Sequence, residues 1–156
     1  MTPLETHVNK LLNYYEHDKI WRREVAALPE EAVDLCRRML KRKTSSLAKK
    51  KRIIELLARI DDERVSSMLE KLTAASEPIL RAKAARALEK RGVDSPGIRN
   101  CLIKGLEDES TVVREKSAQA LCTLAPDVAR EHLEKLASSD PHKYTRTKVS
   151  RMLTSM

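Results

Sequence analysis

The side chains best suited to do chemistry in this sequence are cationic, and nine of the 31 lysines and arginines gather in one segment. Residues 35–54 hold nine lysines and arginines and no acidic residue, and the whole chain has a formal net charge of +8. Clustered cations of this kind attract phosphate groups or the acidic surface of another protein. The segment therefore predicts a site for an anionic partner, and we expect Arg37, Arg38, Lys41 and Lys43 to form its centre.

Further lysines recur at one position of a repeated pattern. Lys71, Lys104 and Lys135 stand at equivalent places in three similar segments, and Arg38 stands at the same place in an earlier one. If these segments are stacked helices, the four side chains form a row with steps of about 10 Å. Such a row is either a binding stripe or an ordinary solvated face, because solvent-facing helix positions are often lysine. Both interpretations stand at this point.

The residue types that commonly serve catalysis are scattered along the chain. The four histidines are not spaced as metal ligands, and the three cysteines lack the paired spacing of a zinc site or a disulfide framework. The sequence contains neither a glycine-rich phosphate loop nor the motif of a metalloprotease or a serine hydrolase. We therefore predict a protein that is not an enzyme and that has no catalytic residue, metal or cofactor.

The basic residues belong to a helical pattern that occurs several times. Residues 80–88 match residues 113–121, which lie 33 positions later, and residues 145–153, which follow after a further 32. A weaker copy lies at residues 49–57. A period in this range indicates stacked units that bury a core only together. The composition agrees with a helical protein, because aromatic residues make up 3% of the chain, charged residues make up 35%, and only three glycines are present.

This pattern resembles the first helix of a HEAT-type repeat. The matching signature runs from an aspartate through a valine–arginine pair and small residues to a leucine, and its members are Asp108, Val113, Arg114, Ser117, Ala120 and Leu121. The resemblance implies an all-α fold, a short right-handed α-solenoid of about nine to ten helices in antiparallel pairs. It also implies that the second helix of each pair lines the concave surface, which makes Lys71, Lys104 and Lys135 the better candidates for a binding stripe.

The resemblance gives one column of the repeat a structural interpretation. Arg81, Arg114 and Arg146 share a position, and Asp108 and Asp140 each lie six residues before the arginine of their own copy. We expect these aspartates to pair with arginines between neighbouring repeats, in the C-terminal half of the chain only. A partly buried pair of this kind is costly to break from one side.

Prolines and glycines that interrupt helices, together with the spacing of the apolar residues, predict where each helix begins and ends. We expect the first helix of each pair, the A helix, at residues 46–59, 77–91, 110–124 and 141–154. We expect the second, the B helix, at residues 30–42, 62–74, 95–107 and 126–137. The chain is then one solenoid domain. Its parts are an N-terminal helical cap (1–28), a first B-like helix (29–43), three HEAT-like repeats (44–76, 77–109 and 110–140) and an unpaired last A helix (141–156).

The N-terminal segment lies outside the repeats. Residues 4–17 and 18–28 are expected to form two helices, and they hold three of the four aromatic residues, Tyr14, Tyr15 and Trp21. We favour a cap that closes the end of the solenoid, since terminal repeats are atypical. A ligand pocket or a base-stacking platform is the alternative.

Repeats without catalytic residues predict a scaffold or adaptor that binds another macromolecule, and a protein with an acidic surface is the expected partner. The alternative is a nucleic-acid-binding protein that contacts the phosphate backbone through residues 37–52, because aromatic residues for base stacking are few. Self-association through the C-terminal helix is a further hypothesis. No apolar run is long enough to span a membrane and no signal peptide is recognisable, so we expect a cytoplasmic location, or a nuclear one in a eukaryote.

Overall fold

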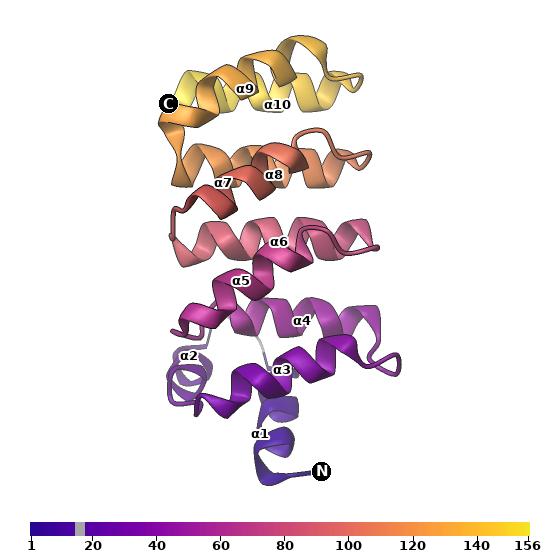
Figure 1. Ribbon diagram of the computed structural model, residues 1–156, viewed down its shortest axis with the longest axis vertical. Coiled ribbons are helices and arrows are strands. Elements are labelled where there is room, and N and C mark those ends of the chain that lie inside the picture. Colours follow the sequence, from indigo (N-terminus) through magenta and orange to yellow (C-terminus); the bar gives the residue numbers. More distant parts are fainter. Residues whose placement is uncertain (15–17) are drawn as a thin grey trace. The chain divides into compact units, whose positions relative to one another are not determined.

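The computed structural model describes residues 1–14 and 18–156, and within them the chain forms ten α-helices and no strand (Figure 1). The helices are α1 (Pro3–Leu11), α2 (Lys19–Ala26), α3 (Glu31–Lys41), α4 (Leu47–Leu57), α5 (Glu63–Leu72), α6 (Pro78–Arg91), α7 (Pro96–Gly105), α8 (Thr111–Leu124), α9 (Pro126–Ser139) and α10 (Lys143–Ser155). The prediction of an all-α fold with nine to ten helices is confirmed.

The chain divides into two compact units, Met1–Met68 and Leu69–Met156, and the boundary falls inside α5. Each unit is therefore described by itself. The expected single solenoid domain, with its cap, its three repeats and its last A helix, stays a prediction.

Local sequence signals account for several helix ends in the second unit. Ser95 caps α7 by accepting a hydrogen bond from the backbone N–H of Ile98 at 3.3 Å, and Pro96 occupies the first turn, where its missing N–H costs nothing. Gly92 ends α6 with a φ of 67°, a left-handed conformation that suits glycine. The A and B helices predicted from the repeat all occur, with ends that differ by a few residues from those expected.

The first helix is shorter than predicted. We expected one helix over residues 4–17, but α1 ends at Leu11, and residues 15–17, which include Tyr15 and His17, lie outside the described residues. The carbonyls of the last residue of α1 and of its C-cap also accept hydrogen bonds from side chains. Trp21 Nε1 donates to the Leu11 carbonyl at 2.9 Å, and Arg52 Nη1 donates to the Leu12 carbonyl at 2.8 Å.

The Trp21 contact bears on the two interpretations of the aromatic segment, both of which stay predictions. The Trp21 side chain is buried and its indole N–H is bound, so this ring is not a platform on which bases can stack. The Asp18 carboxylate is also engaged in a hydrogen bond, because it caps α2 by accepting from the backbone N–H of Ile20 at 2.9 Å. Both side chains therefore have a structural use in the first unit.

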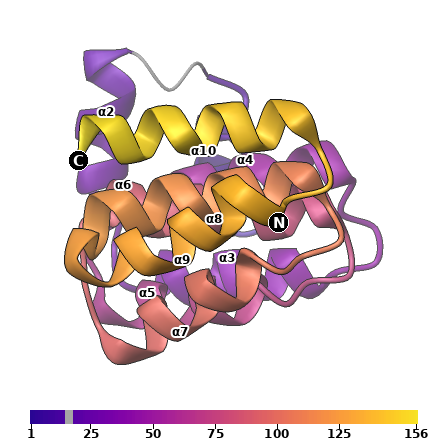
Figure 2. The same ribbon diagram turned by 90° about the horizontal axis from the view of Figure 1, so that it is seen from above.

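The second unit has two layers of helices. Figures 1 and 2 show α6, α8 and α10 side by side in one layer, and α7 and α9 in the other, with α8 in contact with all four neighbours. The A helices bury small residues on several faces, and Ala84, Ala118 and Ala120 are fully enclosed. Small side chains let neighbouring backbones approach closely, which is why the predicted column of small residues lies at these contacts.

The end of α7 approaches the middle of α8 closely. A Cβ atom added to Gly105 would lie 2.1 Å from Ser117 Oγ and 2.9 Å from Ser117 Cβ. Both distances are below van der Waals contact, so position 105 has no room for a side chain unless the helices separate. None of the described helices combines the length and the apolar character needed to cross a membrane.

We predict that Gly105→Ala destabilises the chain by about 1–3 kcal/mol, because it overpacks the α7–α8 contact. Alanine is otherwise favoured over glycine in a helix by about 0.5–1 kcal/mol, so a net loss reports the clash itself. Urea unfolding measures the change. In a Ser117→Ala background the same substitution should cost less, since the 2.1 Å contact is with the hydroxyl oxygen. A Gly105→Ala variant as stable as the original chain would contradict the close approach.

Candidate partner-binding surfaces

The second unit contains a ladder of arginines and aspartates, formed by Arg81, Asp108, Arg114, Asp140 and Arg146. Its first step lies between α6 and the loop before α8. Arg81 Nε and Nη2 donate to the two carboxylate oxygens of Asp108, at 2.8 and 2.9 Å. Arg81 Nη1 donates to the carbonyls of Ala75 and Ser76, each at 2.9 Å. One guanidinium therefore joins the turn before its own helix to the turn before the next A helix.

The second step of the ladder has the same geometry and is more deeply buried. Arg114 Nε and Nη2 donate to the two oxygens of Asp140 at 2.6 and 3.1 Å, and Nη1 donates to the Asp108 carbonyl at 2.9 Å. The Arg114 side chain is 7% exposed and that of Asp140 is 0% exposed. Two parallel N–H···O bonds fix both position and angle, so the pair sets how α8 and α10 are spaced.

The electrostatics of the ladder follow from this geometry. Burial is the largest single influence on the pKa of Asp108 and Asp140 and raises it, but the hydrogen bonds from Arg81 and Arg114, the backbone N–H donors and the nearby positive charges together outweigh it. Backbone N–H groups add to the effect, since Ser110 N donates to Asp108 at 2.9 Å and the backbone N–H two residues after Asp140 donates to that carboxylate at 2.8 Å. The pKa of each aspartate therefore lies below its ordinary value of 3.8, and both are ionised at neutral pH.

The lysines of the predicted row are exposed on the B helices of the second unit. Lys71 lies on α5, Lys104 on α7 and Lys135 on α9, and none of the three forms an ion pair with any described residue. Arg38, the fourth member, lies on α3 of the first unit, so the structure does not align it with the others. The row remains a proposed binding stripe rather than an established one.

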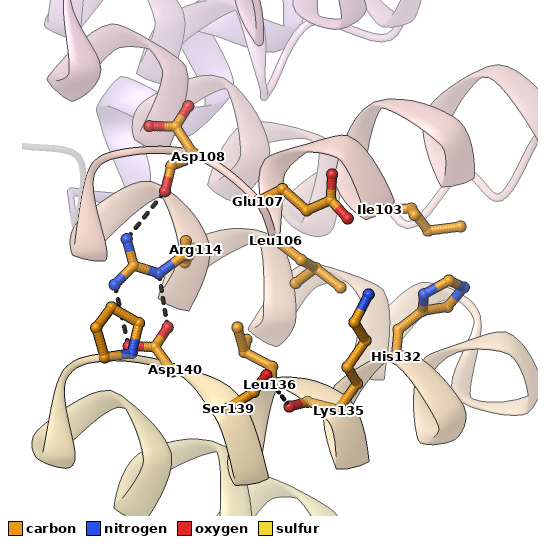
Figure 3. A pocket seen from close by; sticks show the side chains of 11 residues that line it. Ile103, Leu106, Glu107, Asp108, Arg114, His132, Lys135, Leu136, Ser139 and Asp140 are labelled. Carbon is orange, nitrogen blue, oxygen red and sulfur yellow. Dashed lines mark hydrogen bonds and ion pairs between the residues drawn. The ribbon is translucent and has the colours of Figure 1, made fainter.

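A groove of about 410 Å³ lies between α7 and α9 beside this row. Apolar side chains from both helices and the following loop line it, and Figure 3 shows Lys135 between His132 on one side and the Arg114–Asp140 pair on the other. The lining residues are Ile103, Leu106, Glu107, Asp108, Arg114, His132, Lys135, Leu136, Ser139, Asp140 and Pro141. Of the three lysines in the row, Lys135 alone lines this groove.

Sequence reasoning missed most of the groove. Leu106, which directly follows α7, and Leu136 of α9 are buried core residues, and the space between them exists only because α7 and α9 pack on the same A helix. The sequence did contain one indication of the groove, because Lys104 and Lys135 share a repeat position that lies on the surface of the B helices. The width of the groove depends on helix spacing, which the pattern does not contain.

The basic segment of the first unit is partly neutralised by acids from outside the segment. Arg37 pairs with Asp34 at 2.5 Å, and Arg42 pairs with Glu5 of α1 at 2.6 Å. Six cations around the α3–α4 turn are left without an ion pair among the described residues, namely Arg38, Lys41, Lys43, Lys49, Lys50 and Lys51. Of the four residues proposed as the centre of the site, Arg37 is paired, and Arg38, Lys41 and Lys43 have no ion pair among the described residues, so the site stays a proposal.

The structure reveals a second basic region, on the A helices of the second unit. Burial lowers the pKa of Lys116 on α8, and the positive charges of Lys148 on α10 and Arg86 on α6 lower it further. Glu115 offsets part of this crowding by pairing with Lys148 at 2.6 Å. No group of three histidine, cysteine or acidic side chains able to hold a metal ion is found in the described part of the chain.

We predict that the ladder makes stability depend on pH. The pKa of Asp140 is lower in the folded chain than in the unfolded chain, so the stabilisation from its pair is complete above about pH 4 and is lost as the pH falls through the folded value. The double variant Arg114→Met/Asp140→Asn should therefore show a flatter dependence of the unfolding free energy on pH between about 2 and 5 than the original chain.

The single variants provide the control for that comparison. Arg114→Met leaves a buried carboxylate unpaired and should cost on the order of 3 kcal/mol at pH 7, more than the double variant costs. Arg86→Met, which removes an exposed arginine of α6, should leave both the stability and its pH dependence close to the original. An unchanged pH profile in the double variant would contradict the role of the pair.

The comparisons with known proteins agree with this architecture. A family model for HEAT repeats matches residues 68–154, which is more than half of the chain. Comparison with curated protein sequences gives no match. Among solved structures, a chain from the complex of CpcE and CpcF of phycocyanin lyase from Nostoc sp. PCC7120 is similar, with a TM-score of 0.69 and 18% identity over 95% of this chain and 98% of that one. The HEAT-type solenoid fold predicted from the repeat is confirmed, and the chain belongs to the HEAT-repeat family.

Proposed function

We propose that this chain is a scaffold that binds another protein at the groove between α7 and α9. The observation that carries the proposal is the groove itself, whose walls combine apolar side chains with an exposed lysine that has no ion pair among the described residues. Grooves of this kind accept an apolar anchor from a partner, and charges at the rim steer and orient it.

The charges around the groove favour a protein over a nucleic acid as its occupant. Glu107 lines the groove, and α9 carries Asp127, Glu131 and Glu134 beside Arg130 and Lys135. Such a mixed surface does not attract a polyphosphate, whereas a folded protein with both apolar and charged groups can match it. The similar solved structure is a complex of two proteins, CpcE and CpcF, which also supports a protein partner.

We propose that the chain acts by binding rather than by catalysis. The groove holds one histidine, His132, and its ring has no hydrogen-bond partner among the described residues. A catalytic histidine is ordinarily held in one orientation by a second group. The complex of CpcE and CpcF is that of a phycocyanin lyase, so chains of this fold also occur in enzyme complexes. Substitution of the groove residues tests whether the groove has such a role in this chain.

A photo-crosslinking amino acid at Ile103 tests the groove. We expect it to link the chain to a defined protein partner, and Lys135→Glu should reduce that link and weaken the purified complex by about tenfold, or about 1.4 kcal/mol. The same crosslinker at Arg86, which is exposed on α6, is the matched control and should not capture that partner. Equal capture from both positions would count against the groove.

A second candidate function rests on the α3–α4 turn of the first unit. Six cations there have no ion pair among the described residues, and α4 begins without an acidic residue in its first turn. Positive charge at a helix N-terminus opposes the helix dipole, and a bound phosphate would relieve that repulsion. This arrangement supports contact with a phosphate backbone, without sequence readout.

Binding to a labelled random duplex, followed by fluorescence anisotropy across salt concentrations, tests this second function. We expect affinity to fall steeply with salt, as for the release of about four or more counterions. Arg38→Glu/Lys41→Glu/Lys43→Glu should remove most of that affinity, whereas Arg37→Gln should remove little, because Asp34 already neutralises Arg37. Absence of binding at low salt would exclude this function.

A further inference from the structure

The three arginines of the ladder share one anchor. Arg81, Arg114 and Arg146 each donate from Nη1 to the backbone carbonyl six residues earlier, at 2.9, 2.9 and 2.6 Å. Each guanidinium is thereby held at the turn that precedes its own helix. The three groups are equivalent up to this point, so any difference between them lies in what their remaining nitrogens bind.

The remaining donors distinguish Arg146 from the other two. In Arg81 and Arg114, Nε and Nη2 donate to both oxygens of an aspartate. In Arg146 the same two nitrogens have no hydrogen-bond or ion-pair partner among the described residues, although the residue is half-buried. A guanidinium that is anchored on one side has already lost much of its conformational freedom. Binding a carboxylate at its free nitrogens therefore costs little additional side-chain entropy.

The face of α10 around Arg146 has the residues of a helix contact. Thirty-two positions earlier, α8 has Arg114, Ala118 and Leu121, and the last two are fully buried. The corresponding residues of α10 are Ser150, which is exposed, and Leu153, which is half-buried. The face is small in side-chain volume and apolar at its far end, as the face of α8 is.

We propose that this face of α10 binds a helical hairpin of a partner protein, and that the hairpin presents an aspartate from the turn between its two helices. The two aspartates of the ladder define the ligand. Asp108 and Asp140 both lie in the turn before an A helix and both accept from the backbone N–H two residues later. The partner's aspartate occupies the same place relative to Arg146, so the partner surface continues the existing interface by one step.

The charge of α10 identifies the occupant as a different protein rather than a second copy. The helix carries Lys143, Arg146, Lys148 and Arg151 and has no acidic residue. Two copies packed through α10 would place like charges together, which disfavours that dimer. The two aspartates of suitable geometry in the described chain, Asp108 and Asp140, are already bound to arginines.

The test uses the full chain with a second copy of residues 95–124 joined after Met156 by a flexible glycine–serine linker. This copy is the hairpin that presents Asp108 to Arg81, and it has equal numbers of acidic and basic residues, so it supplies the proposed ligand at a high effective concentration without packing a second basic α10 against the first. We expect hydrogen exchange of the α10 amides to slow at least tenfold relative to the chain with the linker alone. We also expect the Nε–H of Arg146 to become protected in nitrogen-15 NMR spectra.

Matched variants separate the proposed contact from a general effect of the linked hairpin. Arg146→Gln, or the change of aspartate to asparagine in the added copy, should abolish at least nine-tenths of the protection, while Arg151→Gln should leave it within twofold. Protection that is absent, or that persists in Arg146→Gln, overturns the proposal. Sedimentation of the original chain that shows a dimer abolished by Arg146→Gln overturns it as well, because the occupant would then be a second copy. None of these changes touches the α7–α9 groove, so the outcome is independent of the proposed function.

Discussion

The second unit depends on one interaction, the two-pronged hydrogen bonding of an arginine to the aspartate of the following repeat. Arg114 and Asp140 are both removed from water, and each would be costly to bury alone. Together they satisfy nearly all of their donors and acceptors, including backbone groups of two turns. The helices pack through buried alanines as well as large residues such as Leu88 and Leu121, and the pairs fix the spacing of the helices where they begin.

This constraint also explains where the proposed binding groove lies. The ladder holds the A helices close together, and the B helices that accompany them are separated by the groove between α7 and α9. Partners of HEAT-type proteins therefore meet side chains from different repeats at one place. The binding residues need no sequence motif of their own, since their proximity is a product of the stacking.

The sequence predicted the fold well because the repeat shows its own period. The breakers Gly92 and Ser95 and the recurring arginine column identified helices that the structure contains at nearly the same residues. The sequence predicted helix ends and local charge less well where these depend on side chains from distant parts of the chain. Trp21 and Arg52 bind the last carbonyls of α1, and Glu5 neutralises Arg42, and such contacts between remote residues leave no local pattern. Arg37 and Arg42 therefore contribute less unpaired positive charge to the first unit than the count of basic residues suggested.

The ladder joins the A helices at the ends where they begin, and this has a mechanical consequence. Strong polar bonds resist separation along that edge, whereas the opposite ends of α8 and α10 are held by side-chain packing. Cys122 and Met156 meet there at an Sγ–Sδ distance of 3.7 Å, beside a hollow of about 450 Å³. Sulfur-containing side chains are polarisable and conformationally adaptable. When the second unit bends, we expect the ends of α8 and α10 near Cys122 and Met156 to change their separation most. The opposite ends, which the arginine–aspartate pairs hold, should keep their separation and act as the hinge.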